Sequence, residues 1–167
     1  TTSFQGYPTI TGLADGGFVV SWMSDAQDGS GSGIYAQRYD AQGVAIGSEF
    51  QVNTYVTLGQ QNPAITALAD GGFVVSWQSN GQDGDSYGIY AQRYDAQGAA
   101  VGVEFQVNTY TTNSQGNPLI SALADGGFVV SWMSDAQDGS GWGIYAQRYN
   151  AAGEPVTSAN PLVYQGQ

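Results

Sequence analysis

The feature that most constrains this chain is an internal repeat. The run "ADGGFVVSW" begins at Ala14, Ala69 and Ala124, a constant step of 55 residues. A unit of this length that recurs three times indicates an array of equal structural modules. We therefore expect one repeat domain over residues 1–167, with units near 1–55, 56–110 and 111–167. Because Thr1 falls inside a repeat, we expect the chain to be a mature fragment or an excised piece.

Each unit is expected to form four short antiparallel strands and no helix. In the first unit these are residues 8–13, 18–23, 33–40 and 48–54. The "ADGG" segment between the first two strands is a strong hairpin signal, since Asp and Gly tolerate the positive φ of a tight turn. In the last strand the alternation predicts that Phe50 and Val52 are buried, whereas Glu49, Gln51 and Asn53 are exposed.

The second strand is apolar on both faces, so each sheet needs a neighbour on either side. Phe18, Val20 and Trp22 share one face, and Val19 and Met23 lie on the other. A radial stack of equal sheets, the blades of a β-propeller, satisfies this need. Propellers usually have about four to eight blades, so two chains are expected to form a six-bladed ring. A monomer with threefold pseudosymmetry, a β-prism or β-trefoil, is the alternative.

The run from Ala69 to Thr109, "ADGGFVVSWQSNGQDGDSYGIYAQRYDAQGAAVGVEFQVNT", resembles the tandem repeats of large exported bacterial proteins, often of the RTX type. The resemblance covers the whole chain. It implies a secreted or cell-surface setting, calcium-rich surroundings and a role in adhesion or ligand binding, and it assigns no catalytic residues. The chain lacks the G-G-x-G-x-D run of RTX nonapeptides. In the third unit "EPVTSANPLVYQ" replaces the last strand, which suggests a terminal blade.

The charge of the chain limits its partners. Fourteen acidic residues face three arginines, and there is no lysine or histidine. Nucleic acid and anionic membrane surfaces are therefore excluded as favourable partners, because the dominant electrostatic contribution would be repulsive. No segment approaches the roughly 20 apolar residues of a membrane-spanning helix. Cations remain as candidates.

The polar loop after the second strand is the candidate calcium site. It reads "SDAQDGSGSG", "SNGQDGDSYG" and "SDAQDGSGWG" in the three units. Calcium takes oxygen ligands, and the glycines let such a loop curl around an ion. The alternative is that these side chains cap backbone turns. The candidate ligands are Asp25, Asp28, Asn80, Asp83, Asp85, Asp135 and Asp138.

The arginines and the loop aromatics are the candidate ligand-binding residues. A guanidinium on an apolar strand needs a partner, so we expect each arginine to pair with an aspartate of an adjoining loop or turn. Alternatively, its donors grip sugar hydroxyls together with an aromatic ring and an acidic or amide acceptor. Exposed rings stack on sugars or on partner surfaces. These candidates are Arg38, Arg93, Arg148, Tyr87 and Trp142.

Repeated sites without catalytic groups predict a binding protein. Histidine, lysine and cysteine are absent, so the common bases and activated nucleophiles are missing and no enzyme is expected. Three equal weak sites gain avidity by linkage. We therefore predict a multivalent extracellular binding module for a glycan or another cell-surface ligand, lectin-like and calcium-dependent. The alternative is a structural spacer or assembly repeat of a bacterial surface protein.

Overall fold

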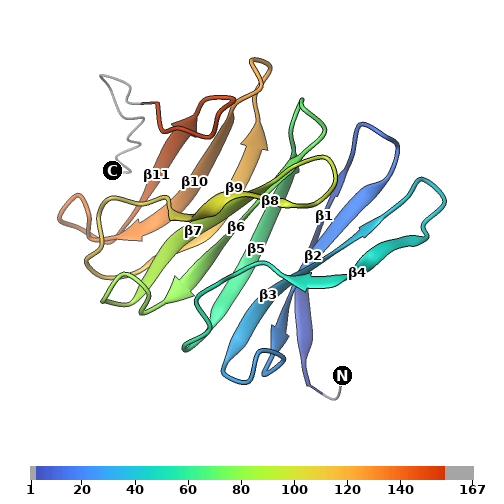
Figure 1. The fold of residues 1–167 in the computed structure, drawn as a ribbon. Coiled ribbons are helices and arrows are strands. Elements are labelled where there is room, and N and C mark those ends of the chain that lie inside the picture. The colour runs from blue at the N-terminus through green and yellow to red at the C-terminus, as the bar shows by residue number, and fades with distance from the viewer. Residues whose placement is uncertain (1–2, 157–167) are drawn as a thin grey trace.

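A computed structural model describes residues 3–156, which form eleven strands and no helix. Each repeat contributes one antiparallel sheet whose strands lie in chain order (Figure 1). The all-β prediction is therefore confirmed. The strands are β1 (Gln5–Gly12), β2 (Phe18–Asp25), β3 (Ser32–Tyr39) and β4 (Ala45–Gln51) in repeat 1; β5 (Gln60–Ala67), β6 (Phe73–Asn80), β7 (Tyr87–Tyr94) and β8 (Ala100–Gln106) in repeat 2; and β9 (Gln115–Ala122), β10 (Phe128–Asp135) and β11 (Trp142–Tyr149) in repeat 3.

The predicted "ADGG" hairpin joins the first two strands of every sheet. In repeat 1 the amide of Gly16 donates to the carbonyl of Leu13, and Gly16 has φ of 85°. The amide of Gly17 donates to the carboxylate of Asp15 at 2.9 Å. Glycine suits the third position of this turn because an L side chain rarely adopts such a φ. The aspartate is fixed here by the main chain, which gives it a defined direction.

The outermost strand begins earlier than expected. The "DAQG" turn closes with a hydrogen bond from the Asp40 amide to the Val44 carbonyl, so β4 already starts at Ala45 and ends at Gln51. The chain then turns inward. Asn53 is only 4% exposed, and the prediction that it is exposed is wrong. Val52 is buried, as predicted, whereas Phe50, predicted to be buried, and Gln51, predicted to be exposed, are both half-buried. The alternation of a strand cannot be carried past the point where the strand ends.

Each sheet has two different apolar faces, which we name after one residue. The tryptophan face carries, in repeat 2, Phe73, Val75, Trp77, Tyr90 and Tyr94. The isoleucine face carries, in repeat 1, Val19, Met23, Ile34 and Ala36. The cross-strand register confirms the two sets, since Trp22 pairs with Tyr35 whereas Met23 pairs with Ile34.

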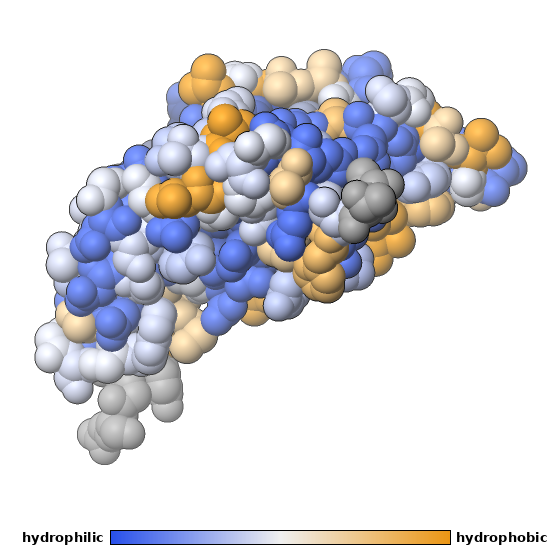
Figure 2. Space-filling view, turned by 90° about the horizontal axis from the view of Figure 1, so that it is seen from below, coloured by the Kyte–Doolittle hydropathy of each residue, from blue (hydrophilic) through white to orange (hydrophobic). Residues whose placement is uncertain are grey.

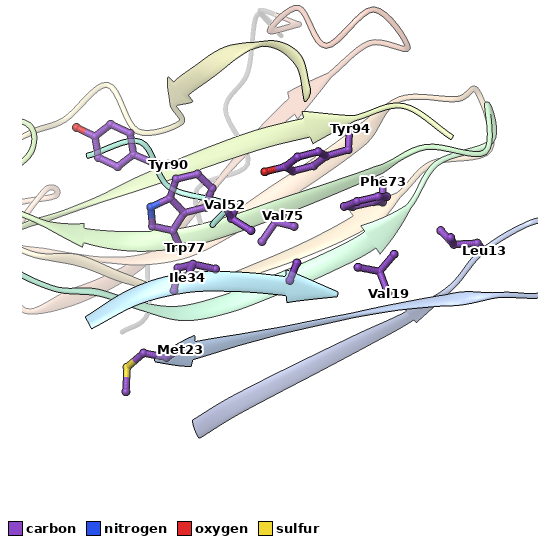
Figure 3. Close-up of a cluster of buried hydrophobic side chains, with 11 residues drawn as sticks. Leu13, Val19, Met23, Ile34, Val52, Phe73, Val75, Trp77, Tyr90 and Tyr94 are labelled. Carbon is purple, nitrogen blue, oxygen red and sulfur yellow. The ribbon is translucent and has the colours of Figure 1, made fainter. Parts of the chain in front are cut away.

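The sheets stack with unlike faces together. The isoleucine face of repeat 1 packs on the tryptophan face of repeat 2, where Ile34 and Trp77 are both fully buried (Figure 3). The isoleucine face of repeat 2 packs in the same way on repeat 3. The first strands of the three sheets, β1, β5 and β9, also contact one another. The hydroxyl of Thr11 accepts a hydrogen bond from the amide of Ala67, and the hydroxyl of Thr66 accepts one from the amide of Ala122. Two equivalent junctions therefore hold the described residues together.

Among residues 3–156, no further sheet covers either end of the stack. The tryptophan face of repeat 1 leaves Ile10 64% exposed, and the isoleucine face of repeat 3 leaves Ile144 47% exposed. Figure 2 shows hydrophobic side chains on the surface over repeat 1, at the right of that view. Both buried clusters join neighbouring repeats, and neither joins repeat 1 to repeat 3 within residues 3–156. A closed threefold monomer would leave no such open ends.

The third sheet has three described strands, to which Pro155 adds a single bridge with Tyr149. The rest of the segment that we expect to be a terminal blade, residues 157–167, lies outside the described residues. None of the described sheets closes on itself. The order of the strands therefore does not by itself distinguish a propeller from another stack of antiparallel sheets. No membrane-spanning helix is found among the described residues.

Candidate functional site

Every arginine forms an ion pair with the aspartate of the "ADGG" turn. The guanidinium Nη2 of Arg38 lies 2.6 Å from Asp15, and that of Arg93 lies 2.5 Å from Asp70. Arg148 pairs with Asp125 in the same way. This geometry agrees with the expectation that each arginine pairs with an aspartate of an adjoining loop or turn. A bond from the Gly17 amide and the charge of Arg38 together hold the pKa of Asp15 below its usual value.

The three arginines differ in their surroundings. The side chains of Arg38 and Arg93 are 15% and 16% exposed, whereas that of Arg148 is 50% exposed. All three lie on isoleucine faces, because each pairs across strands with the valine of that face. The first two faces are covered by the next repeat and the third is open. Arg38 and Arg93 therefore lie at the junctions between repeats.

The acidic loops are organised as turns. Asp28 accepts a hydrogen bond from the Ser30 amide, and Asp138 accepts one from Ser140. In repeat 2, Asp85 also accepts from the amide of Asn113, on the connection to repeat 3. No group of three or more carboxylates that could hold a metal ion occurs among residues 3–156. The calcium prediction for Asp25, Asp28, Asn80, Asp83, Asp85, Asp135 and Asp138 stays a prediction, and the turn-capping alternative accounts for the contacts.

The aromatic candidates lie at the acidic-loop end of the sheets, away from the arginines. Trp142 is 55% exposed and Tyr87 is half-buried, while the equivalent Ser32 is only 8% exposed. The connection to repeat 2 covers Ser32, since its Oγ lies close to Gly59. Tyr87 and Arg93 stand six residues apart on β7, which is roughly 20 Å at about 3.3 Å per residue. The structure does not bring the aromatic and arginine candidates of one repeat together.

A cleft between repeats 2 and 3 is lined by aromatic residues and has an arginine, Arg93, beside it. Its volume is about 360 Å³, within the range of small-ligand pockets. The rings of Phe105 and Tyr149 lie 5.3 Å apart and are tilted by 56°. Burial raises the pKa of Tyr149, so its hydroxyl keeps its proton at neutral pH. The lining residues are Phe105, Gln106, Val107, Thr109, Gln147, Tyr149, Gly153 and Pro155.

Neighbouring repeats contribute complementary polar groups to this cleft. Arg93 belongs to repeat 2 and Gln147 to repeat 3. Gly153 lines the cleft. The Nη1 of Arg93 lies 3.9 Å from the position that a Cβ atom would take at Gly153. The Nε of Arg93 is buried and has no hydrogen-bond partner among the described residues. Within one repeat the arginine and the neighbouring glutamine point to opposite faces, but across the junction they face the same space.

Sequence reasoning missed a buried amide network that fixes the connections between repeats. The Oδ1 of Asn53 accepts from the Ile34 amide at 2.7 Å, and its Nδ2 donates to the Tyr55 carbonyl and to Gln60 Oε1. Asn108 and Gln115 repeat the pattern one unit later. The recurrence of "QVNTY" before each connection is the sequence signal that could have indicated it. This network positions the strands on both sides of each junction.

A second hollow lies along the first strands of the three sheets, β1, β5 and β9. Its volume is about 290 Å³, and it is lined by equivalent residues of all three repeats, including Tyr7, Asn62 and Asn117. These three residues have φ between 52° and 54°, at the bulge that precedes each proline. The Nδ2 of Asn62 donates to Asn117 Oδ1 at 3.0 Å, so part of the polar lining is already paired.

Comparison with known proteins indicates the fold and no family. No protein-family model and no curated protein matches the chain. A protein of unknown function from Dyadobacter fermentans superposes with a TM-score of 0.67 at 11% identity, over 95% of this chain and 56% of that one. An α-L-arabinofuranosidase from Lactobacillus brevis gives 0.59 at 12%, over 97% and 58%. A sialidase, Hadza microbial sialidase Hz136, gives 0.64 at 15%, over 94% and 37%. The chain spans just over half the length of the first two.

Proposed function

We propose that this chain is a multivalent carbohydrate-binding module whose binding sites are the clefts between neighbouring repeats. The observation that carries the proposal is the cleft between repeats 2 and 3. It offers the half-buried ring of Phe105 for a sugar face, backed by the buried ring of Tyr149, and amide groups for hydroxyls. Most of its lining is apolar with a few placed polar groups, as is typical of small-ligand sites.

The polar groups of the cleft match the needs of a sugar. Gln106, Thr109 and Gln147 supply amides and a hydroxyl. The Nε2 of Gln147 already donates to the carbonyls of Arg148 and Val156, and that of Gln106 donates to Asp83, so the two glutamines offer their Oε1 atoms as acceptors for sugar hydroxyls. Arg93 adds charged donors at the margin. Its carboxylate partner Asp70 holds the guanidinium in one orientation. A planar group that is already oriented loses less entropy when it binds a ligand.

Binding suits this cleft better than hydrolysis. Glycosidases generally need a pair of carboxylates that flank the scissile bond. The described lining of the cleft contains aromatic, aliphatic, amide and hydroxyl side chains but no carboxylate. Several aspartates lie instead on turns, where main-chain amides bind them, as at Asp28 and Asp70. Glu49 and Glu104 lie on β4 and β8, and neither is part of the described lining of the cleft. We therefore propose a non-catalytic role, in a secreted or cell-surface protein.

We further propose that the sheets are blades of a β-propeller. Each sheet has its first strand innermost and its unlike faces against the neighbours, which is how radial blades pack. The superposition on carbohydrate-active enzymes over nearly the whole chain supports the same architecture. Equal clefts then recur between blades, which explains why a binding protein would repeat one unit.

The test is glycan binding by the chain and by matched variants. A glycan array, read with and without a calcium chelator, identifies ligands and shows whether calcium contributes. Affinity for a positive glycan is then measured by calorimetry. Arg93→Ala is expected to weaken binding by about 10-fold or more, since hydrogen bonds to charged groups contribute about 1.5–3 kcal/mol. Gln147→Ala is expected to weaken it by about 2- to 10-fold, since a bond between neutral groups contributes about 0.5–1.5 kcal/mol. Gln42→Ala, on an exposed turn far from the cleft, is the control.

A structural spacer is the second candidate function. It is favoured by the fact that the arginines and loop aspartates already have protein partners. A blank array, together with a melting temperature that a chelator lowers, would support the spacer and contradict the proposal. A glycan signal that Gln147→Ala leaves unchanged would place the sugar elsewhere, with Trp142→Ala as the next variant.

A further inference from the structure

The two open ends of the stack are the two halves of the junction that the chain makes twice within itself. Repeat 3 ends in an uncovered isoleucine face, and repeat 1 begins with an uncovered tryptophan face. We propose that the isoleucine face of repeat 3 docks on the tryptophan face of repeat 1 in a second copy of this chain. Two such contacts then close a ring of six sheets.

On the second and third strands of each sheet, the apolar residues of the proposed junction are the same as those of the existing ones. The strand "FVVSWMSD" is identical in β2 and β10, and "GIYAQRY" is identical in β3, β7 and β11. Val129, Met133, Ile144 and Ala146 thus repeat the isoleucine face of repeat 1. Phe18, Val20, Trp22, Tyr35 and Tyr39 repeat the tryptophan face of repeats 2 and 3. The contacts that bury Ile34 against Trp77 are therefore available to Ile144 and a second copy's Trp22.

The apolar side chains at the two ends are more exposed than the equivalent side chains within the stack. Ile34 and Ile89 are fully buried, but the equivalent Ile144 is 47% exposed. Leu119 is 69% exposed, whereas Ala64, at the same position of repeat 2, is 8% exposed. Soluble proteins seldom leave large contiguous apolar surfaces uncovered unless a partner binds there. Both ends of this chain present such surfaces.

Polar groups at the ends also match the existing junctions. Thr11 and Thr66 accept main-chain hydrogen bonds from Ala67 and Ala122 of the next repeat. The equivalent residue in repeat 3 is Ser121, which keeps the hydroxyl, and its donor would be the Gly12 amide of the second copy. The proposed junction would therefore contain the same kind of hydroxyl-to-amide hydrogen bond as the two existing junctions.

Each end is also hollowed. The tryptophan face of repeat 1 carries a hollow of about 220 Å³, lined by Pro8, Val20 and Trp22 with Gln5 and Gly6. The isoleucine face of repeat 3 carries one of about 290 Å³ beside Leu119, Met133 and Ile144. The residues equivalent to Val20, Trp22, Met133 and Ile144 contact one another in the junction of repeats 1 and 2. A second copy would fill both hollows with these side chains.

The contact joins two different surfaces, and only a closed ring satisfies both surfaces of every chain. An arrangement of this kind forms a ring if the rotation closes and an open filament if it does not. Closure would also bring Arg148 of one chain towards Gln37 and Tyr39 of the other, as Arg93 lies beside the cleft that Gln147 and Tyr149 line. The inference rests on the packing of the sheets and stands whether or not the clefts bind sugar.

The first experiment is the solution mass of the chain by analytical ultracentrifugation over a range of concentrations. We expect twice the 17.5 kDa of one chain. Ile144→Asp and Ile10→Asp each place a charge on one proposed face, and each is expected to raise the dimer dissociation constant by about 100-fold or more. Val103→Asp, at a residue that is 83% exposed on β8 and outside both faces, is expected to leave the dimer intact. Circular dichroism confirms that all three variants fold.

A mixing experiment identifies which surfaces meet. Ile144→Asp keeps its repeat 1 face intact, and Ile10→Asp keeps its repeat 3 face intact. Each variant alone should be monomeric, and an equimolar mixture should form a heterodimer through the one remaining good junction. A monomeric wild-type chain, a larger open assembly, or variants that still dimerise alone would each overturn the proposal.

Discussion

Replacing Asn53 by alanine is expected to destabilise the chain strongly, although the residue lies on a connection. The substitution removes three hydrogen bonds, to the Ile34 amide, the Tyr55 carbonyl and Gln60 Oε1. Ile34 and Gln60 are fully buried, so no water replaces the lost partner at either. Each buried group left without a partner costs about 1–3 kcal/mol.

The expected loss in the free energy of unfolding is therefore about 4 kcal/mol, which corresponds to roughly 10 °C in melting temperature for a domain of this size. Urea unfolding followed by tryptophan fluorescence measures it, at one fixed protein concentration. Gln97→Ala, on the exposed turn between β7 and β8, should change stability by less than about 0.5 kcal/mol. A loss below about 1 kcal/mol for Asn53→Ala would refute the reasoning, since the network would then contribute no more than a solvent-exposed contact.

Three further predictions follow from other contacts. Gly72→Ala should cost about 1–3 kcal/mol or more, because the added Cβ would lie 2.3 Å from the Tyr94 carbonyl oxygen, whereas Gly12→Ala, with no atom within 4 Å, should be close to neutral in thermal melts. Arg93→Ala should destabilise the chain more than Arg148→Ala in the monomeric Ile144→Asp background, since only the first guanidinium is covered by a neighbouring repeat; equal losses there would contradict the assigned clefts. Burial tends to raise the pKa of Asp70, but the Gly72 amide and Arg93 outweigh it and lower this pKa below 3.8. The ion pair therefore stabilises the fold above about pH 4 and is lost as the pH falls through the lowered value, so unfolding measured from pH 6 to pH 2 should depend less on pH in Asp70→Asn.

Most of the fold could be predicted from the sequence because the repeat supplies the same signal three times. Alternation in "FVVSWM" predicts which side chains lie on each face of the second strand. The Asp-Gly pair predicts the hairpin between the first two strands. The partner of each arginine could also be anticipated by type, since a guanidinium on an apolar strand needs a carboxylate. The observed partners, such as Asp15 for Arg38, lie in the turn between the first two strands of the same sheet.

The cleft could not be predicted, because it depends on how one sheet lies against the next. Periodicity within a strand shows that Arg93 and its neighbour Gln92 point to opposite faces. It does not show that Arg93 shares a cleft with Gln147, which belongs to the following repeat. The buried role of Asn53 was missed for a related reason, since an asparagine just beyond a strand resembles a solvated connector until its three partners are known.

The identity of the junctions has a consequence for how this protein folds. All three repeats have the same recognition chemistry, so the tryptophan face of repeat 2 or 3 accepts an isoleucine face from another molecule as readily as from the preceding repeat of its own chain. At high concentration, refolding should therefore yield mispaired and exchanged species that compete with the native order. Dilution, or synthesis of one repeat after another on the ribosome, favours the neighbour that is tethered nearby.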